Sequence, residues 1–218
     1  MNPIPAIQSM HRWEAYFSAP EGSSAFQFLY GKDSEALQVE RYRRVLCGFA
    51  ARFGEFPVAL ISAPGRTELC GNHTDHQHGR VIAAAVDMET TAEVTLNGTN
   101  IIRVDSEGYK PVEIGLNDLS VKESEKNTTA ALIRGVAAAF QQRGYKLAGF
   151  DAKVKSTVLP GSGLSSSAAF EVLIGRILNG LFANGEVSAI EIAQIGQYAE
   201  NVYYGKPSGL MDQMASSV

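Results

Sequence analysis

The chain has 218 residues and a formal net charge of −4, from 19 basic and 23 acidic side chains. With 45% hydrophobic and 19% charged residues, it has the composition of a globular protein, which excludes collagen, coiled coils and intrinsically disordered chains. The mild acidity argues against a general nucleic-acid-binding protein, which needs a basic face. Two cysteines are too few for a disulfide framework or a four-ligand zinc site.

The sequence carries no pattern for export or membrane insertion. The apolar run over residues 81–86 is far shorter than the roughly 20 residues needed to cross a membrane. The first 19 residues lack the basic-then-apolar order of a signal peptide, and the free cysteines Cys47 and Cys70 favour a reducing compartment. We therefore expect a cytoplasmic protein without membrane or nucleic-acid partners.

The first half of the chain predicts one helix followed by several strands. Residues 1–32 predict irregular structure whose many aromatic side chains pack onto a neighbouring element. A helix is expected from Asp33 or Ser34 to about Phe53, because apolar residues recur there at helical spacing. A polar loop is expected over residues 64–80. Short strands are expected at 58–61, 81–86, 90–96 and 101–104.

The second half is richer in helices. Asn127 or Thr128 is the expected cap of a helix that ends before Gly144. Residues 152–158 alternate apolar and polar side chains, which indicates a strand with one exposed face. Two more helices are expected at about 164–181 and 188–204. Strands concentrated in the first part, helices in the second and mixed connections favour an α+β fold over a doubly wound parallel sheet.

A glycine- and serine-rich turn precedes the helix expected at 164–181. Residues 159–169 read Leu-Pro-Gly-Ser-Gly-Leu-Ser-Ser-Ser-Ala-Ala. The first N–H groups of a helix lack helical acceptors and favour an anion, so the segment predicts either a phosphate site or a plain capped helix. It is not a Walker A loop, because no Gly-Lys-Ser/Thr follows, and Ser166 replaces the third glycine of a dinucleotide-binding fingerprint.

The loop over residues 64–80 holds three of the four histidines and many other polar side chains. A metal site would use His73, His76, His78 and Asp75, but their spacing matches no established zinc pattern. A solvated loop is one alternative. A sugar site is another, since Asp, Asn, His and Arg side chains pair with vicinal hydroxyl groups.

Two acidic residues stand out towards the end of the sequence. Glu200 lies in the helix expected at 188–204, and Asp212 follows it. One carboxylate could hold Mg²⁺ while the other takes a proton from a hydroxyl group. Taken alone, each is more often a surface acid or a helix cap.

Together these segments resemble the GHMP small-molecule kinases, and galactokinases most closely. Residues 65–76 read Gly-Arg-Thr-Glu-Leu-Cys-Gly-Asn-His-Thr-Asp-His, where the family has Gly-Arg-x-Asn-Leu-Ile-Gly-Glu-His-Thr-Asp-Tyr. The family's Gly-Leu-Ser-Ser-Ser-Ala stands intact at 163–168. Ala-Glu-Asn stands at 199–201, and Gly-Leu-Met-Asp-Gln at 209–213 matches Gly-Ile-Met-Asp-Gln. The motifs keep the family's order, so the resemblance covers about residue 55 to the end.

The resemblance implies a GHMP kinase N-terminal domain over residues 1–218. Such a domain has a mixed or antiparallel sheet packed by helices, as in domain 2 of ribosomal protein S5. The family's third glycine-rich motif is not found after Asp212. We therefore expect the C-terminal domain to be absent, the chain to be inactive or weakly active alone, and a surface that would face that domain to promote association.

The resemblance also implies a sugar kinase that moves the γ-phosphoryl group of ATP, with Mg²⁺, to the 1-hydroxyl of galactose. Asp212 is the implied base, and Arg66 holds it ionised and stabilises the phosphoryl group in transfer. Ser167 (or Ser166) and Glu200 are the implied Mg²⁺ ligands. The implied phosphate cradle is Gly161, Ser162, Gly163, Leu164, Ser165, Ser166 and Ser167. The implied sugar-binding residues are Arg66, Asn72, His73, Asp75, Gly209 and Asp212.

Three positions depart from the family pattern. Glu68 replaces the usual Asn, Asn72 replaces the usual Glu, and His76 replaces Tyr. The resemblance places Asn72 near O6 of the sugar, and a neutral amide repels a carboxylate less than Glu would. Galacturonate and N-acetylgalactosamine therefore stay alternative substrates, and a non-catalytic galactose and ATP sensor is a further alternative. The hydroxyl-pairing residues 72–75 argue against mevalonate or homoserine as the acceptor.

Overall fold

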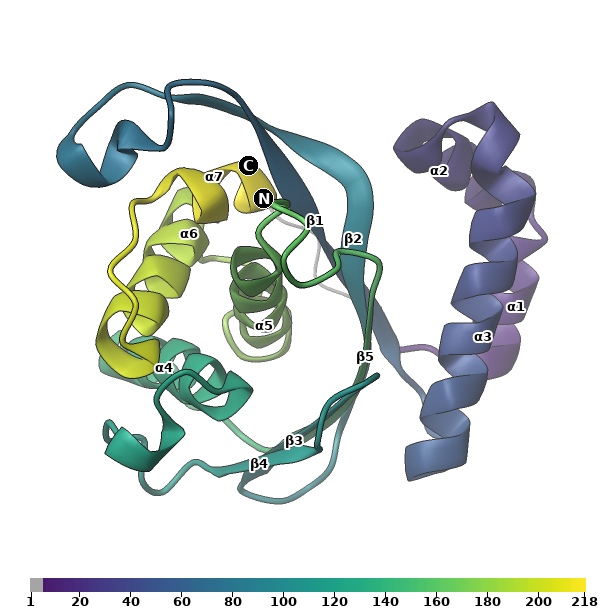
Figure 1. Cartoon of the computed structure of the whole chain (residues 1–218). Helices are drawn as coiled ribbons and strands as arrows, with labels where there is room; N and C mark the ends of the chain where they lie inside the picture. The colour runs from purple at the N-terminus through teal and green to yellow at the C-terminus, as the bar shows by residue number, and fades with distance from the viewer. Residues whose placement is uncertain (1–5) are drawn as a thin grey trace.

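A computed structural model describes residues 6–218, and a five-stranded sheet lies at its centre between two layers of helices (Figure 1). The sheet has the order β1-β2-β5-β3-β4, and its neighbouring strands are antiparallel except for the parallel pair β3 and β5. The strands are β1 (Ala59–Cys70), β2 (Ile82–Leu96), β3 (Ile101–Ser106), β4 (Val112–Gly115) and β5 (Phe150–Ser156). The predicted α+β fold with a mixed sheet is confirmed.

Three helices form the layer on one face of the sheet (Figure 1). They are α1 (Met10–Phe17), α2 (Pro20–Tyr30) and α3 (Glu35–Phe53). The prediction of irregular structure over residues 1–32 is therefore wrong for most of that range; residues 1–5 lie outside the described part. Helical propensity in α2 is weak because Gly22 and two serines occupy it. Packing supplies the missing stability, through the buried cluster Phe17, Phe26, Tyr30, Tyr42, Leu46, Phe49 and Val58.

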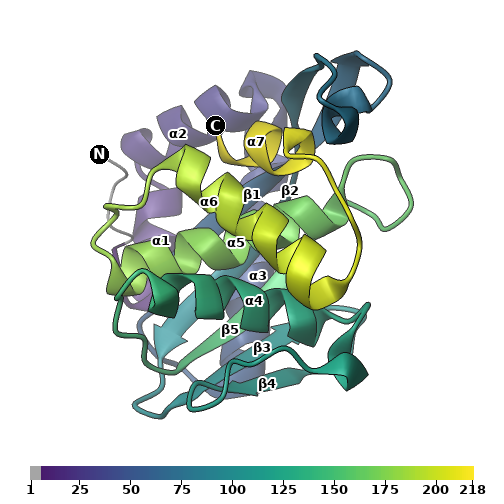
Figure 2. The ribbon, with the colours of Figure 1, turned by 90° about the vertical axis from the view of Figure 1, so that its left-hand side faces the viewer.

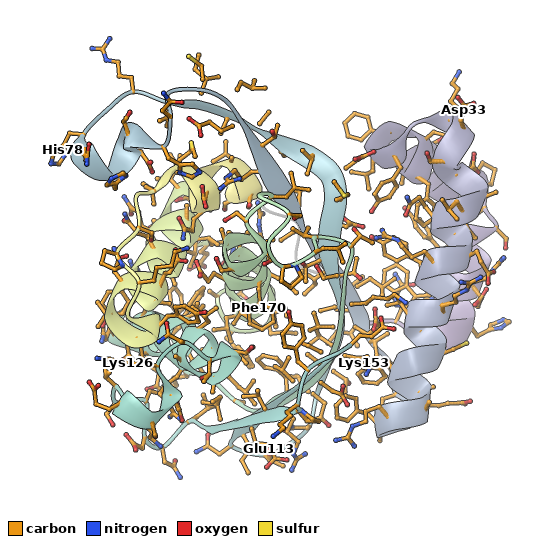
Figure 3. All side chains as sticks on the ribbon, in the orientation of Figure 1. Asp33, His78, Glu113, Lys126, Lys153 and Phe170 are labelled. Atoms are coloured by element: carbon orange, nitrogen blue, oxygen red, sulfur yellow. The ribbon has the colours of Figure 1, made fainter. Side chains whose placement is uncertain are left out.

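Four helices cover the opposite face (Figure 2). Thr128 caps the first of them and Ser188 forms a capping box with Glu191 at the third, so the predicted helix starts are confirmed. On β5, Ala152 and Val154 pack into the core beneath these helices, while Lys153 lies on the other face, towards α3 (Figure 3). The helices are α4 (Thr129–Gln142), α5 (Ser166–Phe182), α6 (Ala189–Tyr198) and α7 (Met211–Ser217).

A π-helical turn over Ala199–Tyr204 continues α6, so the helix predicted at 188–204 exists but changes type near its end. The 3-10 turns are Lys32–Ser34, Thr74–Gln77 and Glu123–Glu125. Within residues 6–218, no helix is long and apolar enough to cross a membrane.

The β1–β2 hairpin is much longer than predicted. β1 runs on to Cys70, and β2 is continuous where two separate strands were expected. The loop predicted at 64–80 therefore shrinks to residues 71–81. The prediction was too short because Pro64 indicates the end of a strand. In the structure β1 is an edge strand, where a missing N–H is tolerated, and its register shifts between Pro64 and Arg66.

Candidate functional site

A bidentate ion pair between Arg66 and Asp212 forms the centre of the candidate site. Arg66 lies on β1 directly after the register shift, and Asp212 lies in the first turn of α7. Nε of Arg66 donates to Oδ1 of Asp212 at 2.7 Å, and Nη2 donates to Oδ2 at 2.9 Å. Arg66 is only 5% exposed, so water competes little for these bonds. The fold thus joins two predicted residues that are 146 positions apart.

The surroundings of Asp212 keep its carboxylate ionised. Burial raises the pKa of Asp212, but hydrogen bonds from Arg66 and Ser165 outweigh burial, and the pKa lies below its ordinary value. Oγ of Ser165 donates to Oδ2 of Asp212 at 2.5 Å. The side chain is therefore a proton acceptor at neutral pH, although its basicity is reduced by the same bonds.

The remaining bonds of Arg66 connect three segments. Nη1 donates to the carbonyl oxygen of Gly163 at 2.5 Å, and Nη2 lies 3.1 Å from Nε2 of His73. A guanidinium only donates, so Nε2 of His73 must accept, and a neutral imidazole then carries its proton on Nδ1. Arg66 therefore holds the glycine turn, the loop after β1 and helix α7 in one arrangement.

The N-terminus of α5 is not capped by a side chain. Ser165 occupies the N-cap position in a left-handed conformation (φ 58°), and its hydroxyl bonds Asp212 instead of the helix backbone. The N–H groups of the first turn, which holds Ser166 and Ser167, are therefore left for another acceptor. The plain capped helix is thus wrong, and an anion site is favoured.

The backbone of the turn before α5 lies close to the N-terminus of that helix. Gly161 and Gly163 have φ of 76° and 77°, which only glycine adopts readily. Ser162 is exposed and donates its hydroxyl to the carbonyl oxygen of Leu159 at 2.6 Å. The carbonyl oxygen of Leu164 accepts from the N–H of Arg66 at 3.0 Å, so the turn is fixed against β1.

Glu200 and Ser167 form a second contact beside the first. Oγ of Ser167 donates to Oε1 of Glu200 at 3.2 Å, and Nζ of Lys206 lies 3.2 Å from the same oxygen. Glu200 is 2% exposed and lies in the π-helical turn, a type of turn found often at functional sites. A hydroxyl and a carboxylate are hard oxygen donors of the kind that Mg²⁺ prefers, so this pair fits the ion.

The loop after β1 faces the start of α7. Oδ2 of Asp75 accepts from the N–H of Met211 at 2.9 Å. A Cβ atom on Gly209 would lie 1.9 Å from that oxygen, so this position has no room for a side chain. Asp75 and Gly209, predicted to share one pocket, are therefore in contact.

Glu68 supports the conformation of this loop, a role that the sequence did not indicate. Oε1 of Glu68 accepts from the backbone N–H of His73 at 2.9 Å. Asn72 and His73 both have φ of 53°, a strained value for these residues, and the carboxylate of Glu68 stabilises this backbone conformation.

Asn72 is exposed, and His78 lies at the tip of the loop (Figure 3). Among residues 6–218, no three His, Cys, Asp or Glu side chains are grouped to hold a metal ion.

A cavity of about 830 Å³ opens beside Ser166 and Ser167. Its walls include apolar side chains from several elements, among them Val154 of β5, Phe170 of α5 (Figure 3) and Tyr204 of the π-helical turn. Thr90, Asn127 and Thr128 add polar groups. Apart from Ser166 and Ser167, no sequence pattern predicted this lining, because its members come from elements that meet only in the folded chain.

Two protein-family models match the chain. The GHMP kinases N terminal domain matches residues 131–218, and the galactokinase galactose-binding signature matches residues 48–96. The fold is that of a GHMP kinase N-terminal domain. The two matched ranges contain every site residue described above except the cavity-wall residues Asn127 and Thr128.

Curated galactokinases are similar to this domain. Those of Streptomyces coelicolor and Bacillus subtilis are 40% and 37% identical to it, over 78% and 77% of the chain. The chain spans 43% of the length of each. Among solved structures, Lactococcus lactis galactokinase complexed with galactose has a TM-score of 0.74 and 31% identity, and covers 80% of this chain and 46% of its own. Methanococcus jannaschii mevalonate kinase, at 21% identity and a TM-score of 0.63, supports the fold alone.

Proposed function

We propose that this domain binds galactose and ATP and transfers the γ-phosphoryl group to the 1-hydroxyl of the sugar, giving galactose 1-phosphate and ADP. The observation that carries the proposal is the convergence of the Arg66–Asp212 pair on the uncapped start of α5. The matched galactose-binding signature and the relative complexed with galactose support the choice of sugar. Residues 6–218 would act together as the sugar- and phosphate-binding domain.

In this mechanism the ionised Asp212 accepts the proton of the 1-hydroxyl while the sugar oxygen bonds the γ-phosphorus and the bond to ADP breaks. Arg66 stabilises the charge on the phosphoryl oxygens and keeps Asp212 ionised. Mg²⁺, when bound, neutralises charge on the phosphates, and Ser167 and Glu200 would hold it. Most of the rate enhancement then comes from positioning and electrostatics, as is usual for phosphoryl transfer.

The phosphates of ATP would lie on the glycine turn and the first N–H groups of α5. The segment from Gly161 to Ser167 supplies positive-φ glycines, free N–H donors and serine hydroxyls. The neighbouring cavity of about 830 Å³ is of a size that takes a small ligand. Its apolar walls, with Phe170 and Tyr204, suit the base of the nucleotide.

The sugar would lie between the loop after β1 and the start of α7. The residues that would border the sugar are Asn72, His73, Asp75, Gly209 and Asp212. A second candidate substrate is galacturonate or N-acetylgalactosamine, because Asn72 is neutral and exposed where the family has Glu. We place the protein in the cytoplasm, and the exposed, free cysteines Cys47 and Cys70 support a reducing compartment.

Calorimetric titration of the chain tests this proposal. We expect saturable binding of galactose and of MgATP, with galacturonate and N-acetylgalactosamine as comparison sugars. Asp212→Asn keeps the shape of the side chain, so galactose binding is expected to survive it. A chain that binds ATP but none of these sugars would contradict the sugar-kinase assignment.

A further inference from the structure

A buried polar cluster lies behind the candidate site, and two of its three residues, Gln213 and Glu171, take no direct part in the proposed reaction. It joins Gln213 on α7 to Glu171 on α5 and to Glu200 in the π-helical turn. Nε2 of Gln213 donates to Oε2 of Glu171 and to Oε2 of Glu200, both at 2.9 Å. Gln213 and Glu171 are fully buried, and Glu200 is 2% exposed. Burying three such groups is costly unless they are hydrogen-bonded. Oε1 of Gln213 and Oε1 of Glu171 have no partner, so the two bonds from Nε2 of Gln213 are what connects the three residues.

The bond from Gln213 determines the direction in which the carboxylate of Glu200 faces its other partners. Oε2 of Glu200 is taken by the amide of Gln213, and Oε1 faces Ser167 and Lys206. Turning the carboxylate would break the bond to Gln213 where little water reaches, so the loss would not be replaced. Gln213 therefore fixes Oε1 in the direction of Ser167.

The same residue connects the two acids of the site. Asp212 and Gln213 are neighbours at the start of α7; the first bonds Arg66 and the second bonds Glu200. One short helix thus positions both carboxylates relative to the end of α5. Glu171 accepts from the same Nε2, so the amide of Gln213 is bonded to two other elements, α5 and the π-helical turn.

Helix α6 packs closely against the cluster at Gly196. A Cβ atom on Gly196 of α6 would lie 3.1 Å from Cγ of Gln213 and 3.2 Å from Oε2 of Glu171. Glycine at this position therefore lets α6 pass directly against the pair. The amide of Gln213 is thus held by packing as well as by hydrogen bonds.

We propose that Gln213 is a positioning residue that orients Glu200 towards the Mg²⁺ of the bound nucleotide, with Glu171 as its second anchor. This inference rests on the proposed function, because it assigns a use to Glu200 that only a magnesium-nucleotide site has. It predicts that Gln213 affects the metal-dependent part of nucleotide binding and leaves the metal-independent part unchanged.

The test measures the affinity of the chain for a non-hydrolysable ATP analogue by calorimetry, with and without Mg²⁺. In Gln213→Met we expect the gain in affinity that Mg²⁺ confers to fall about tenfold, the typical effect of losing a group that orients a metal ligand. Affinity without Mg²⁺ should not change. A merely structural role would lower both affinities together, or only the melting temperature.

The matched control is Asn179→Leu, which removes another buried amide on α5. Asn179 is 2% exposed and bonds the backbone of Val187, away from the candidate site. We expect this variant to melt at a lower temperature but to keep the full effect of Mg²⁺. This control separates the general effect of losing a buried amide from the specific effect of losing the amide of Gln213.

A second pair of variants tests the anchor. Glu171→Gln keeps an oxygen that can accept from Gln213, so it should retain the effect of Mg²⁺, whereas Glu171→Leu should lower it. If Gln213→Met does not fold, the difference between the two Glu171 variants tests the inference instead. A folded Gln213→Met with the full Mg²⁺ effect, or equal effects in the two Glu171 variants, would overturn the inference alone. A wild-type chain whose nucleotide binding ignores Mg²⁺ would overturn the proposed magnesium site and the inference with it.

Discussion

At the scale of single residues, Arg66 is used in a way that only arginine allows. Its guanidinium bonds both oxygens of Asp212, the carbonyl oxygen of Gly163 and the ring of His73. Lysine carries the same charge but cannot form the two parallel bonds, because its ammonium is a single point of charge.

We therefore predict that Arg66→Lys lowers galactose-dependent ADP release by about 10- to 100-fold, the equivalent of one lost charged hydrogen bond. The rate is measured with ATP and Mg²⁺ at saturating galactose, and circular dichroism checks the fold. Arg44→Lys is the control, because the pair of Arg44 with Glu40 is exposed on α3. Equal rates for Arg66→Lys and the wild type would contradict the bidentate role.

Glu93 is a second residue with an unusual environment. It lies on β2, is fully buried, and neither of its carboxylate oxygens has a hydrogen-bond partner. Burial raises the pKa of Glu93 to about 8, although Lys153 and Lys155 act in the opposite direction. Between its ordinary pKa and 8, the folded chain holds a proton that the unfolded chain has released, so stability falls as pH rises through this range.

We predict that Glu93 contributes a slope of about 1.4 kcal/mol per pH unit to the free energy of unfolding over this range. Glu93→Gln should remove that contribution, so the difference between the two proteins should grow in favour of the variant as pH rises. Urea unfolding at a series of pH values between 5 and 8 measures it. A difference that stays constant with pH would show that Glu93 is not protonated in the folded chain.

At the scale of elements, the start of α7 has to approach the loop after β1 closely. Gly209 makes this approach feasible, since any side chain there would meet Asp75. Gly209→Ala should therefore separate the two segments that border the proposed sugar space.

We expect Gly209→Ala to weaken galactose binding at least tenfold in calorimetry while leaving the binding of metal-free ATP unchanged, because the cavity wall lies elsewhere. Gly48→Ala is the matched control: a Cβ atom there meets nothing within 4 Å in helix α3. That variant should keep galactose binding and gain about 1 kcal/mol of stability. Unchanged galactose affinity in Gly209→Ala would place the sugar elsewhere.

How far the sequence predicts the elements depends on whether their signals are local. Thr128 and Ser188 mark helix starts through their own side chains, and both were found. Helices α1 and α2 were missed because their stability comes from aromatic packing against α3 rather than from propensity. The long β1 was missed because its pairing with β2 overrides the local effect of Pro64.

The candidate site shows the same division. The glycine–serine segment is recognisable by itself, but no local signal links Arg66 to Asp212, and only the motif order of a related family placed them together. Glu68 and Gln213 were not given roles, since their partners are fixed by backbone conformation and tertiary contact.

At the scale of the whole molecule, the candidate site lies on one side of the sheet. β1, the glycine turn, the π-helical turn and α7 supply its residues, whereas α1–α3 lie across the sheet (Figure 1). Helices α1 and α2 also fall outside both family-model matches, which begin at residue 48. The N-terminal layer therefore supports the sheet from behind without contributing to the site.

The most direct test of the account is ADP release by the purified chain with ATP and Mg²⁺, measured for galactose and glucose in the wild type and in Asp212→Asn. Because we expect the chain to be at most weakly active alone, we predict a slow release that depends on galactose, is far smaller with glucose, and falls about 10²–10⁴-fold in Asp212→Asn, as loss of a general base requires. Release that is equal for the two sugars, or that Asp212→Asn leaves unchanged, would contradict the assignment of this site to galactose phosphorylation.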